Sequence, residues 1–176
     1  MSDAVTDAMN TFVQLSSLLT GFNVDVIAPT IDSVNLKQTL FDYAQGHTGP
    51  TFDALLAEYA TAADGKTVDQ MTPEERQQVG EAVLGSPDPK VSATARAINK
   101  VWYLGSWYQP FDYNGNPQDL TGGVVVSDQA YIKGLAWQVM QSHAMGFSTF
   151  TYGYSNEGPP ALENFTSNPA PQGGQE

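Results

Sequence analysis

Hydrophobic residues recur every three or four positions along most of this chain, which is the spacing of one face of an α-helix. The first such face lies near the N-terminus, and Gly21 supplies a stop signal directly after it. Its members are Phe12, Leu15, Leu18, Leu19 and Phe22. A second helix is predicted over residues 27–41, with Pro29 tolerated near its start.

Three more helices are predicted in the middle of the chain. The first has an apolar face of Phe52, Leu55, Leu56 and Tyr59 and ends before Asp64. Thr72 and Glu75 form a capping-box pattern around Pro73, which predicts a helix that starts there and ends at about Leu84. The next helix places on one face Val91, Ala95, Ile98, Trp102 and Gly105.

The pattern then becomes irregular. Residues 109–123 are rich in turn-forming dipeptides such as Asn114-Gly115 and are a candidate hairpin. Residues 124–126, three valines, predict a short strand or a packed extended segment. Ser127 is the predicted N-cap of one last helix, which carries Tyr131, Leu135, Val139 and Met140, and helical periodicity disappears from Gly146 onward.

These patterns predict a mainly α fold. We expect a compact helical domain of about five to six helices with an irregular, aromatic, Gly/Pro-rich C-terminal arm. Residues 1–8 are expected to be a flexible N-terminus, residues 9–165 a single domain that includes a C-terminal docking arm, and residues 166–176 a disordered tail. The length of 176 residues suits one domain. No apolar run approaches the roughly 18 residues of a membrane span, so direct membrane insertion is not expected.

Charge and cysteine content exclude several classes of function. The chain has 19 acidic and 7 basic residues and a net charge of -12, which argues against nucleic-acid binding and against docking on anionic lipid. The acidity fits either simple solubility or a basic partner surface. The chain contains no cysteine, which rules out disulfides, cysteine-ligated iron–sulfur clusters, c-type haem attachment and a thiol nucleophile.

Residues with catalytic chemistry are sparse. The two histidines, His47 and His143, do not have metal-ligand spacing, and the carboxylates are scattered along the predicted helices and turns. Asp112 to Asn116 faintly resembles a calcium loop, but its twelfth position is Gly123 instead of glutamate. We therefore expect neither catalytic residues nor a metal or cofactor site in this chain.

The aromatic residues form two groups, which have two interpretations. The first group is Trp102, Tyr103, Trp107, Tyr108, Phe111 and Tyr113, and the second is Phe147, Phe150, Tyr152 and Tyr154. They can close the core of a small helical domain, as is favoured for Trp102 and Phe147. They can also form a rigid amphipathic binding surface, because Tyr and Trp bury large areas while ordering few torsions.

Four segments together resemble one family. The first is Phe12-x-x-Leu15-Ser16-x-x-Leu19-Thr20-Gly21, and the second is Ala97-Ile98-x-x-Val101-Trp102-Tyr103-x-Gly105. The third is Val126-x-x-x-x-Ala130-Tyr131 with Trp137, and the fourth runs from Thr151-Tyr152 to Gly158-Pro159. In their order and spacing they are similar to the small subunit of FAD-dependent sugar and polyol dehydrogenase complexes, namely the D-sorbitol, D-fructose and glucose dehydrogenases.

This resemblance implies a non-catalytic small subunit. Its partner would be a large flavoprotein of the glucose–methanol–choline type, which holds FAD and oxidises the CH–OH group of a sugar or polyol, and a cytochrome c subunit often takes the electrons. The small subunit would bind, stabilise and help mature the large one. The residues expected to contact the partner are Trp102, Tyr103, Gly105, Trp107, Tyr152, Tyr154, Gly158 and Pro159.

The chain departs from the family pattern in two places. It has no twin-arginine signal, so the expected location is periplasmic and membrane-associated through the complex if a signal was removed, and cytoplasmic otherwise. After Gly158-Pro159 the family carries a Tyr-Trp pair, whereas this chain continues with Pro160-Ala161-Leu162. Two alternative functions stay open: a free-standing carboxylate-dependent hydrolase, and an acidic carbohydrate-binding or structural module.

Overall fold

The computed structural model describes residues 2–112, 114–118, 122–140, 142 and 166, and it confirms the predicted mainly α fold. The long helices are α1 (Ser2–Thr20), α3 (Leu36–Thr48), α4 (Pro50–Ala63), α5 (Pro73–Leu84) and α6 (Pro89–Leu104). The shorter elements are α2 (Val24–Ile27), a 3-10 turn η1 (Val68–Gln70), β1 (Ser106–Trp107), β2 (Val124–Val125), α7 (Asp128–Ile132) and α8 (Leu135–Val139).

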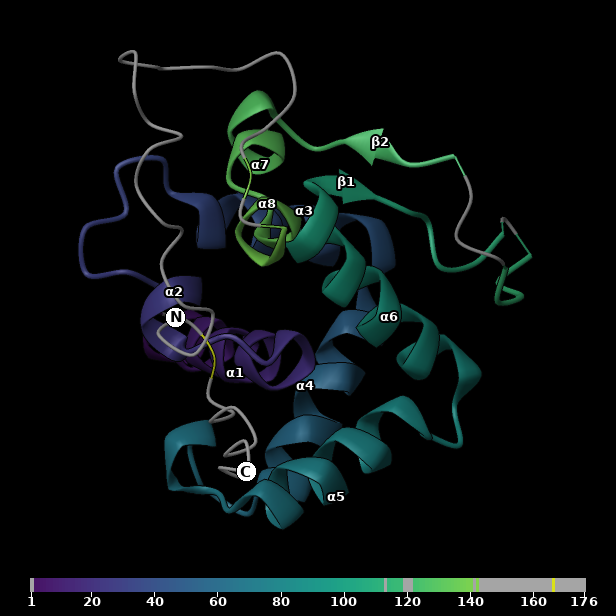
Figure 1. The fold of residues 1–176 in the computed structure, drawn as a ribbon. Coiled ribbons are helices and arrows are strands. Elements are labelled where there is room, and N and C mark those ends of the chain that lie inside the picture. The colour runs from purple at the N-terminus through teal and green to yellow at the C-terminus, as the bar shows by residue number, and fades with distance from the viewer. Residues whose placement is uncertain (1, 113, 119–121, 141, 143–165, 167–176) are drawn as a thin grey trace, which may run out of the picture.

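Helix α6 is the centre of the packing. It contacts α1, α3, α4, α5, α7 and α8, and α1 also packs against α4 (Figure 1). The core between them is aromatic: the ring centroid of Phe41 lies 5.5 Å from that of Phe12 and 5.1 Å from that of Phe52, both edge to face. Such pairs stabilise a core beyond the area that they bury. No helix among the described residues is long and apolar enough to cross a bilayer.

The predicted capping box is present at the start of α5. Thr72 Oγ1 accepts a hydrogen bond of 3.2 Å from the Glu75 N–H, and Glu75 Oε2 accepts one of 2.9 Å from the Thr72 N–H. The ammonium of Lys66, which hydrogen-bonds Glu75, and then the Thr72 N–H hold the pKa of the Glu75 carboxyl below its ordinary value. The helix ends at Leu84, before Gly85, as the sequence predicts.

Two predicted helices are divided in the structure. The prediction of one continuous helix over residues 27–41 is wrong, because α2 ends at Ile27 and α3 begins at Leu36. Asn35 adopts the left-handed conformation, at φ 52°, and Asp32 Oδ1 accepts a hydrogen bond of 3.1 Å from the Leu36 N–H. These two local features end the loop and cap the first residue of α3. Ile31, assigned by its spacing to the buried face, is 85% exposed in the intervening loop.

The last predicted helix is also interrupted. Ser127 caps α7 as expected, since its Oγ accepts the Ala130 N–H at 3.0 Å. The chain then turns at Gly134 before α8 begins. A side chain at Gly134 would place its Cβ 2.7 Å from the Tyr103 carbonyl oxygen, so the break lets this part of the chain approach the backbone of α6 closely.

The two strands are antiparallel, with Ser106 opposite Val125 and Trp107 opposite Val124. These strands flank the range 109–123 in which the sequence predicts a hairpin, so residues 108–123 form the connection between the strands. Within it Asp112 Oδ1 accepts hydrogen bonds from the N–H groups of Asn114 at 2.9 Å and Asn116 at 2.8 Å. These bonds, above all the one from Asn116, lower the pKa of Asp112.

At the chain ends the structure describes two features. Helix α1 begins at Ser2, so helical backbone runs through most of the segment 1–8 for which the sequence predicts a flexible N-terminus. Thr166 forms an isolated antiparallel bridge with Phe22, just beyond α1. Residues 143–165, at the C-terminal end of the predicted domain with its docking arm, and residues 167–176 of the predicted tail 166–176 lie outside the described residues.

Candidate functional site

Three of the segments that carry the family resemblance meet at the C-terminal end of α6 (Figure 1). α6 contacts α1, which holds the first motif, and it also contacts α7 and α8, which hold the third. β1 follows α6 directly and pairs with β2. We call this region the α6 corner, and define it as the last turn of α6 together with β1, β2, α7, α8 and the C-cap of α8, Met140.

Trp102 lies in the core beneath the corner. Its side chain is 2% exposed, and its ring centroid lies 6.3 Å from that of Phe12 in the first motif. Among the described residues the indole Nε1 has no hydrogen-bond partner. The role of Trp102 in the structure is therefore packing, and its influence on a bound partner would act through the shape of the corner.

Tyr103 joins the first motif to the second. Its hydroxyl donates a hydrogen bond of 2.8 Å to the Thr20 carbonyl, and its ring centroid lies 6.1 Å from that of Phe22. Thr20 in turn donates through Oγ1 to the Ser16 carbonyl at 2.8 Å. Partial burial raises the pKa of the Tyr103 phenol above its ordinary value, which favours the protonated form that donates this bond.

Gly105 joins the second motif to the third. It ends α6 in the left-handed conformation, at φ 63°, with its N–H donating to the Val101 carbonyl at 2.8 Å. A Cβ at this position would lie 2.4 Å from the main chain of Ala130. Two features of the structure therefore require glycine at position 105: the left-handed backbone conformation and the close approach of α7.

Trp107 links β1 to α3 through hydrogen bonds and ring contacts. It is 3% exposed, and its Nε1 donates to Gln109 Oε1 at 3.0 Å, while Gln109 Nε2 donates to the His47 carbonyl at 3.3 Å. His47 stacks on Tyr43, with ring centroids 4.1 Å apart, and Trp107 lies 5.9 Å from Tyr43. In this structure His47 acts as part of an aromatic packing group.

Tyr108 attaches the hairpin to the outer side of α6. The Lys100 ammonium lies 4.5 Å from the centroid of its ring, within the range of a cation–π interaction. The Gly123 backbone packs against the ring, since a Cβ on Gly123 would lie 2.5 Å from Tyr108 Cζ. A second cation–π contact, from Lys90 to Phe111 at 5.9 Å, holds the hairpin further along α6.

Although the sequence names Val139 and Met140 on the last predicted helix, it does not predict the exposed apolar residues of the corner. They are Leu104 at 38% exposure, Val124 at 59%, Val125 at 51%, Val139 at 43% and Met140 at 58%. The sequence places Val124 and Val125 in a strand, but alternation alone would bury one of two neighbouring residues. Their joint exposure shows that both faces of β2 are open to solvent at these two residues.

Four more residues are expected to contact the partner. Tyr152, Tyr154, Gly158 and Pro159 lie outside the described residues. Trp137, part of the third motif, donates through Nε1 to the Tyr131 carbonyl at 2.8 Å and so ties α8 to α7. The described motif residues therefore connect the elements of the α6 corner to one another. The exposed apolar side chains lie on those same elements.

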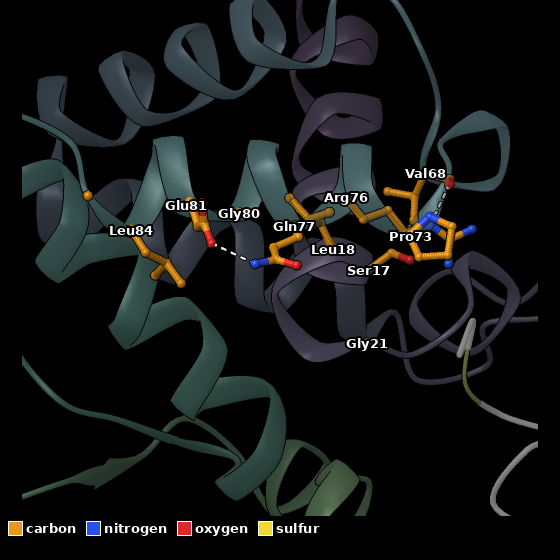
Figure 2. A pocket seen from close by; sticks show the side chains of 11 residues that line it. Ser17, Leu18, Gly21, Val68, Pro73, Arg76, Gln77, Gly80, Glu81 and Leu84 are labelled. Carbon is orange, nitrogen blue, oxygen red and sulfur yellow. Dashed lines mark hydrogen bonds between the residues drawn. The ribbon is translucent and has the colours of Figure 1, made fainter. Parts of the chain in front are cut away.

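A groove of about 720 Å³ lies between α1 and α5 (Figure 2). Its polar groups bond within the protein: Gln77 Nε2 donates to Glu81 Oε1 at 2.8 Å, and Arg76 Nε donates to the Val68 carbonyl at 3.0 Å. Among its described lining residues Glu81 carries the one carboxylate, whereas paired acid–base hydrolysis needs two. The described residues contain no cluster of three or more metal-binding side chains.

No protein-family model, curated protein or solved structure matches this chain. The family resemblance therefore rests on the motifs in the sequence.

Proposed function

We propose that this protein is a non-catalytic small subunit that binds, stabilises and helps mature a large FAD-containing dehydrogenase subunit of the glucose–methanol–choline type. In this proposal the partner holds FAD and oxidises the CH–OH group of a sugar or polyol, and a cytochrome c subunit accepts the electrons. The chain itself contributes no catalytic residue.

The observation that carries this proposal is the construction of the α6 corner. Three motifs of the resemblance interlock through Tyr103 and Gly105, while apolar side chains on the same elements are exposed to solvent. Exposed apolar side chains on a rigid scaffold are typical of a protein-binding surface. The net charge of -12 would favour encounter with a basic partner surface.

The proposal is tested by co-purification of the tagged chain from its native host, with flavin absorption and mass spectrometry of the eluate. A larger flavoprotein, retained in a fixed ratio to this chain, supports it. An eluate that contains this chain alone contradicts it. Assays of the isolated chain for hydrolysis and for sugar binding then test the two alternative functions.

A paired variant locates the surface. Met140→Asp places one charge on the α6 corner, where Met140 is 58% exposed, and should weaken flavoprotein retention, because desolvating an unpaired charge opposes association. Ile31→Asp is the matched control, since Ile31 is apolar and 85% exposed but lies in the α2–α3 loop. Equal retention by both variants would remove the corner from the interface.

A further inference from the structure

The groove between α1 and α5 has open space over Gly80, a residue inside α5. A Cβ built on Gly80, which lines the groove, would have no described atom within 4 Å. Figure 2 shows Leu84 and Pro73 toward opposite ends of the groove, with Leu18 of α1 between them in this view. Leu84 is 38% exposed and Leu18 is half-buried, so apolar surface faces the open space.

The C-terminal part of the chain reaches this groove at one described contact. Thr166 forms an isolated antiparallel bridge with Phe22, and Gly21, the residue before Phe22, lines the groove. In an antiparallel pair the two segments run in opposite directions, so the residues after one partner follow the residues before the other. The chain at Thr166 is therefore directed toward Gly21, where an added Cβ would also meet no described atom within 4 Å.

The residues that follow Thr166 suit the groove in composition. Residues 167–176 read Ser-Asn-Pro-Ala-Pro-Gln-Gly-Gly-Gln-Glu and contain no bulky side chain before the final glutamine and glutamate. Their two prolines favour the polyproline II conformation, which is preformed and therefore loses little entropy on docking. Among the described lining residues the ionised side chains are Arg76 and Glu81, whose charges cancel, so the groove suits a nearly uncharged segment.

The segment is also long enough to follow the groove. In the polyproline II conformation ten residues extend about 31 Å, at about 3.1 Å per residue. The 12 residues of α5 rise about 18 Å, at about 1.5 Å per residue. Residues 167–176 can therefore run from Gly21 along α5 to Leu84.

We infer that residues 167–176 dock in the groove between α1 and α5 of the same chain, with Pro169 and Pro171 against its apolar surface. The inference differs from the disordered tail that composition alone predicts, and it does not depend on the proposed function. Because the bridge at Thr166 tethers the segment beside Gly21, its effective concentration is on the order of millimolar, and a weak fit is enough to fill the groove. In this position the segment closes the groove to other ligands.

A nitroxide spin label on the full chain tests the inference. Because the chain contains no cysteine, Ala170→Cys provides a single site for the label. We expect the label to broaden the amide NMR signals of Gln77 and Glu81 in the groove several-fold more than that of Gly46 in α3. Equal broadening of these signals would show that the segment samples the surface without docking, and overturns the inference.

A mixed sample separates one chain from two. An isotope-labelled chain without the nitroxide is combined with an unlabelled chain that carries it, and the groove signals of the isotope-labelled chain should stay sharp. Broadening as strong as within one chain would assign the groove to the segment of a second copy and overturn the intramolecular contact. Groove amides that are unaffected by the label in the free chain and protected from exchange only in a flavoprotein complex would assign the groove to that partner, and would overturn the inference as well.

A variant pair in the spin-labelled chain provides the second test. Gly80→Leu fills the open space of the groove and should reduce the broadening of Gln77 and Glu81 several-fold. Gly46→Leu is the matched control, because both glycines lie inside helices and an added Cβ would meet no described atom within 4 Å at either. Leucine has the higher helix propensity, so both variants should fold, which circular dichroism verifies. Undiminished broadening in the folded Gly80→Leu variant overturns the inference.

Discussion

The Tyr103 hydroxyl donates a hydrogen bond of 2.8 Å to the carbonyl of Thr20, a residue 83 positions earlier in the chain. The bond joins the last turn of α6 to the last residue of α1 and satisfies one of the carbonyls that every helix leaves unpaired at its C-terminus. It thereby fixes the position of the α6 corner relative to the first motif.

Tyr103→Phe should therefore lower the free energy of unfolding by about 1 kcal/mol, the usual net value of one hydrogen bond. Urea unfolding followed by circular dichroism measures the change. Tyr43→Phe is the matched control, because the Tyr43 side chain is packed through its ring against His47. A Tyr103→Phe variant as stable as this control would show that the bond to Thr20 contributes nothing.

Gly105→Ala should destabilise the chain by more than about 1 kcal/mol, since the left-handed backbone at φ 63° and the contact of 2.4 Å with Ala130 both oppose a side chain. Gly46→Ala serves as the comparison. Gly46 lies inside α3, and its added Cβ would have no atom within 4 Å, so alanine there should raise stability by up to about 1 kcal/mol through helix propensity. Thermal melts of the two variants should shift in opposite directions.

Thr72→Ala should lower stability by about 1 kcal/mol, because the N-cap of α5 loses its side-chain acceptor. Thr61→Ala, near the end of α4, removes only a hydroxyl bonded to the carbonyl of its own helix at Ala57, and should be neutral or slightly stabilising. Chemical denaturation separates the two, and similar losses in both variants would exclude a special role for the cap.

Acid should weaken the same cap. The pKa of Glu75 is lowered in the folded chain, first by Lys66 and then by Thr72, so its contribution is present above its unfolded value of about 4.5 and is lost as the pH falls through the folded value. Glu75→Gln should remove this part of the acid dependence. The measurement is the free energy of unfolding of both proteins between neutral and acidic pH; parallel curves would contradict the prediction.

Tyr59 should make stability fall at alkaline pH. Burial raises the pKa of its phenol from 10.0 to about 12, so the folded chain holds this proton more tightly than the unfolded chain does. The contribution is fully present below pH 10 and is lost as the pH rises from 10 to about 12.

Tyr59→Phe should remove this part of the alkaline decline. At neutral pH its stability should equal or slightly exceed that of the wild type, because the buried hydroxyl has no hydrogen-bond partner among the described residues. Denaturation at several pH values measures both effects. A clear loss of stability at neutral pH would show that the hydroxyl makes a stabilising bond.

Local chemistry allowed most of the helices to be predicted. The capping box of Thr72 and Glu75, the stop at Gly85 and the apolar spacing from Val91 to Trp102 each depend on residues within a few positions of one another, and each appears in the structure. The prediction over residues 27–41 failed because an apolar residue at helical spacing was assigned to a buried face. Spacing carries no information on whether a neighbouring element covers that face, and at Ile31 none among the described elements does.

The candidate site was only partly accessible to sequence reasoning. The aromatic and glycine motifs drew attention to Trp102, Tyr103, Gly105 and Trp107, and the structure brings these residues to one corner. Two of them, Trp102 and Trp107, are almost fully buried, whereas the exposed surface belongs to residues that no motif contained, such as Val125 and Met140.

By itself, then, the sequence determined the helical class of the fold, the N-caps of α5 and α7, the ends of α4 and α5 and the acidic charge of the chain, because periodicity, capping and charge are properties of neighbouring residues. Only the tertiary structure decided that Tyr103 reaches Thr20, that α7 packs closely against Gly105, and that β2 pairs with β1. Those relationships join residues from distant parts of the chain, and they exist only once packing around α6 has brought the elements together.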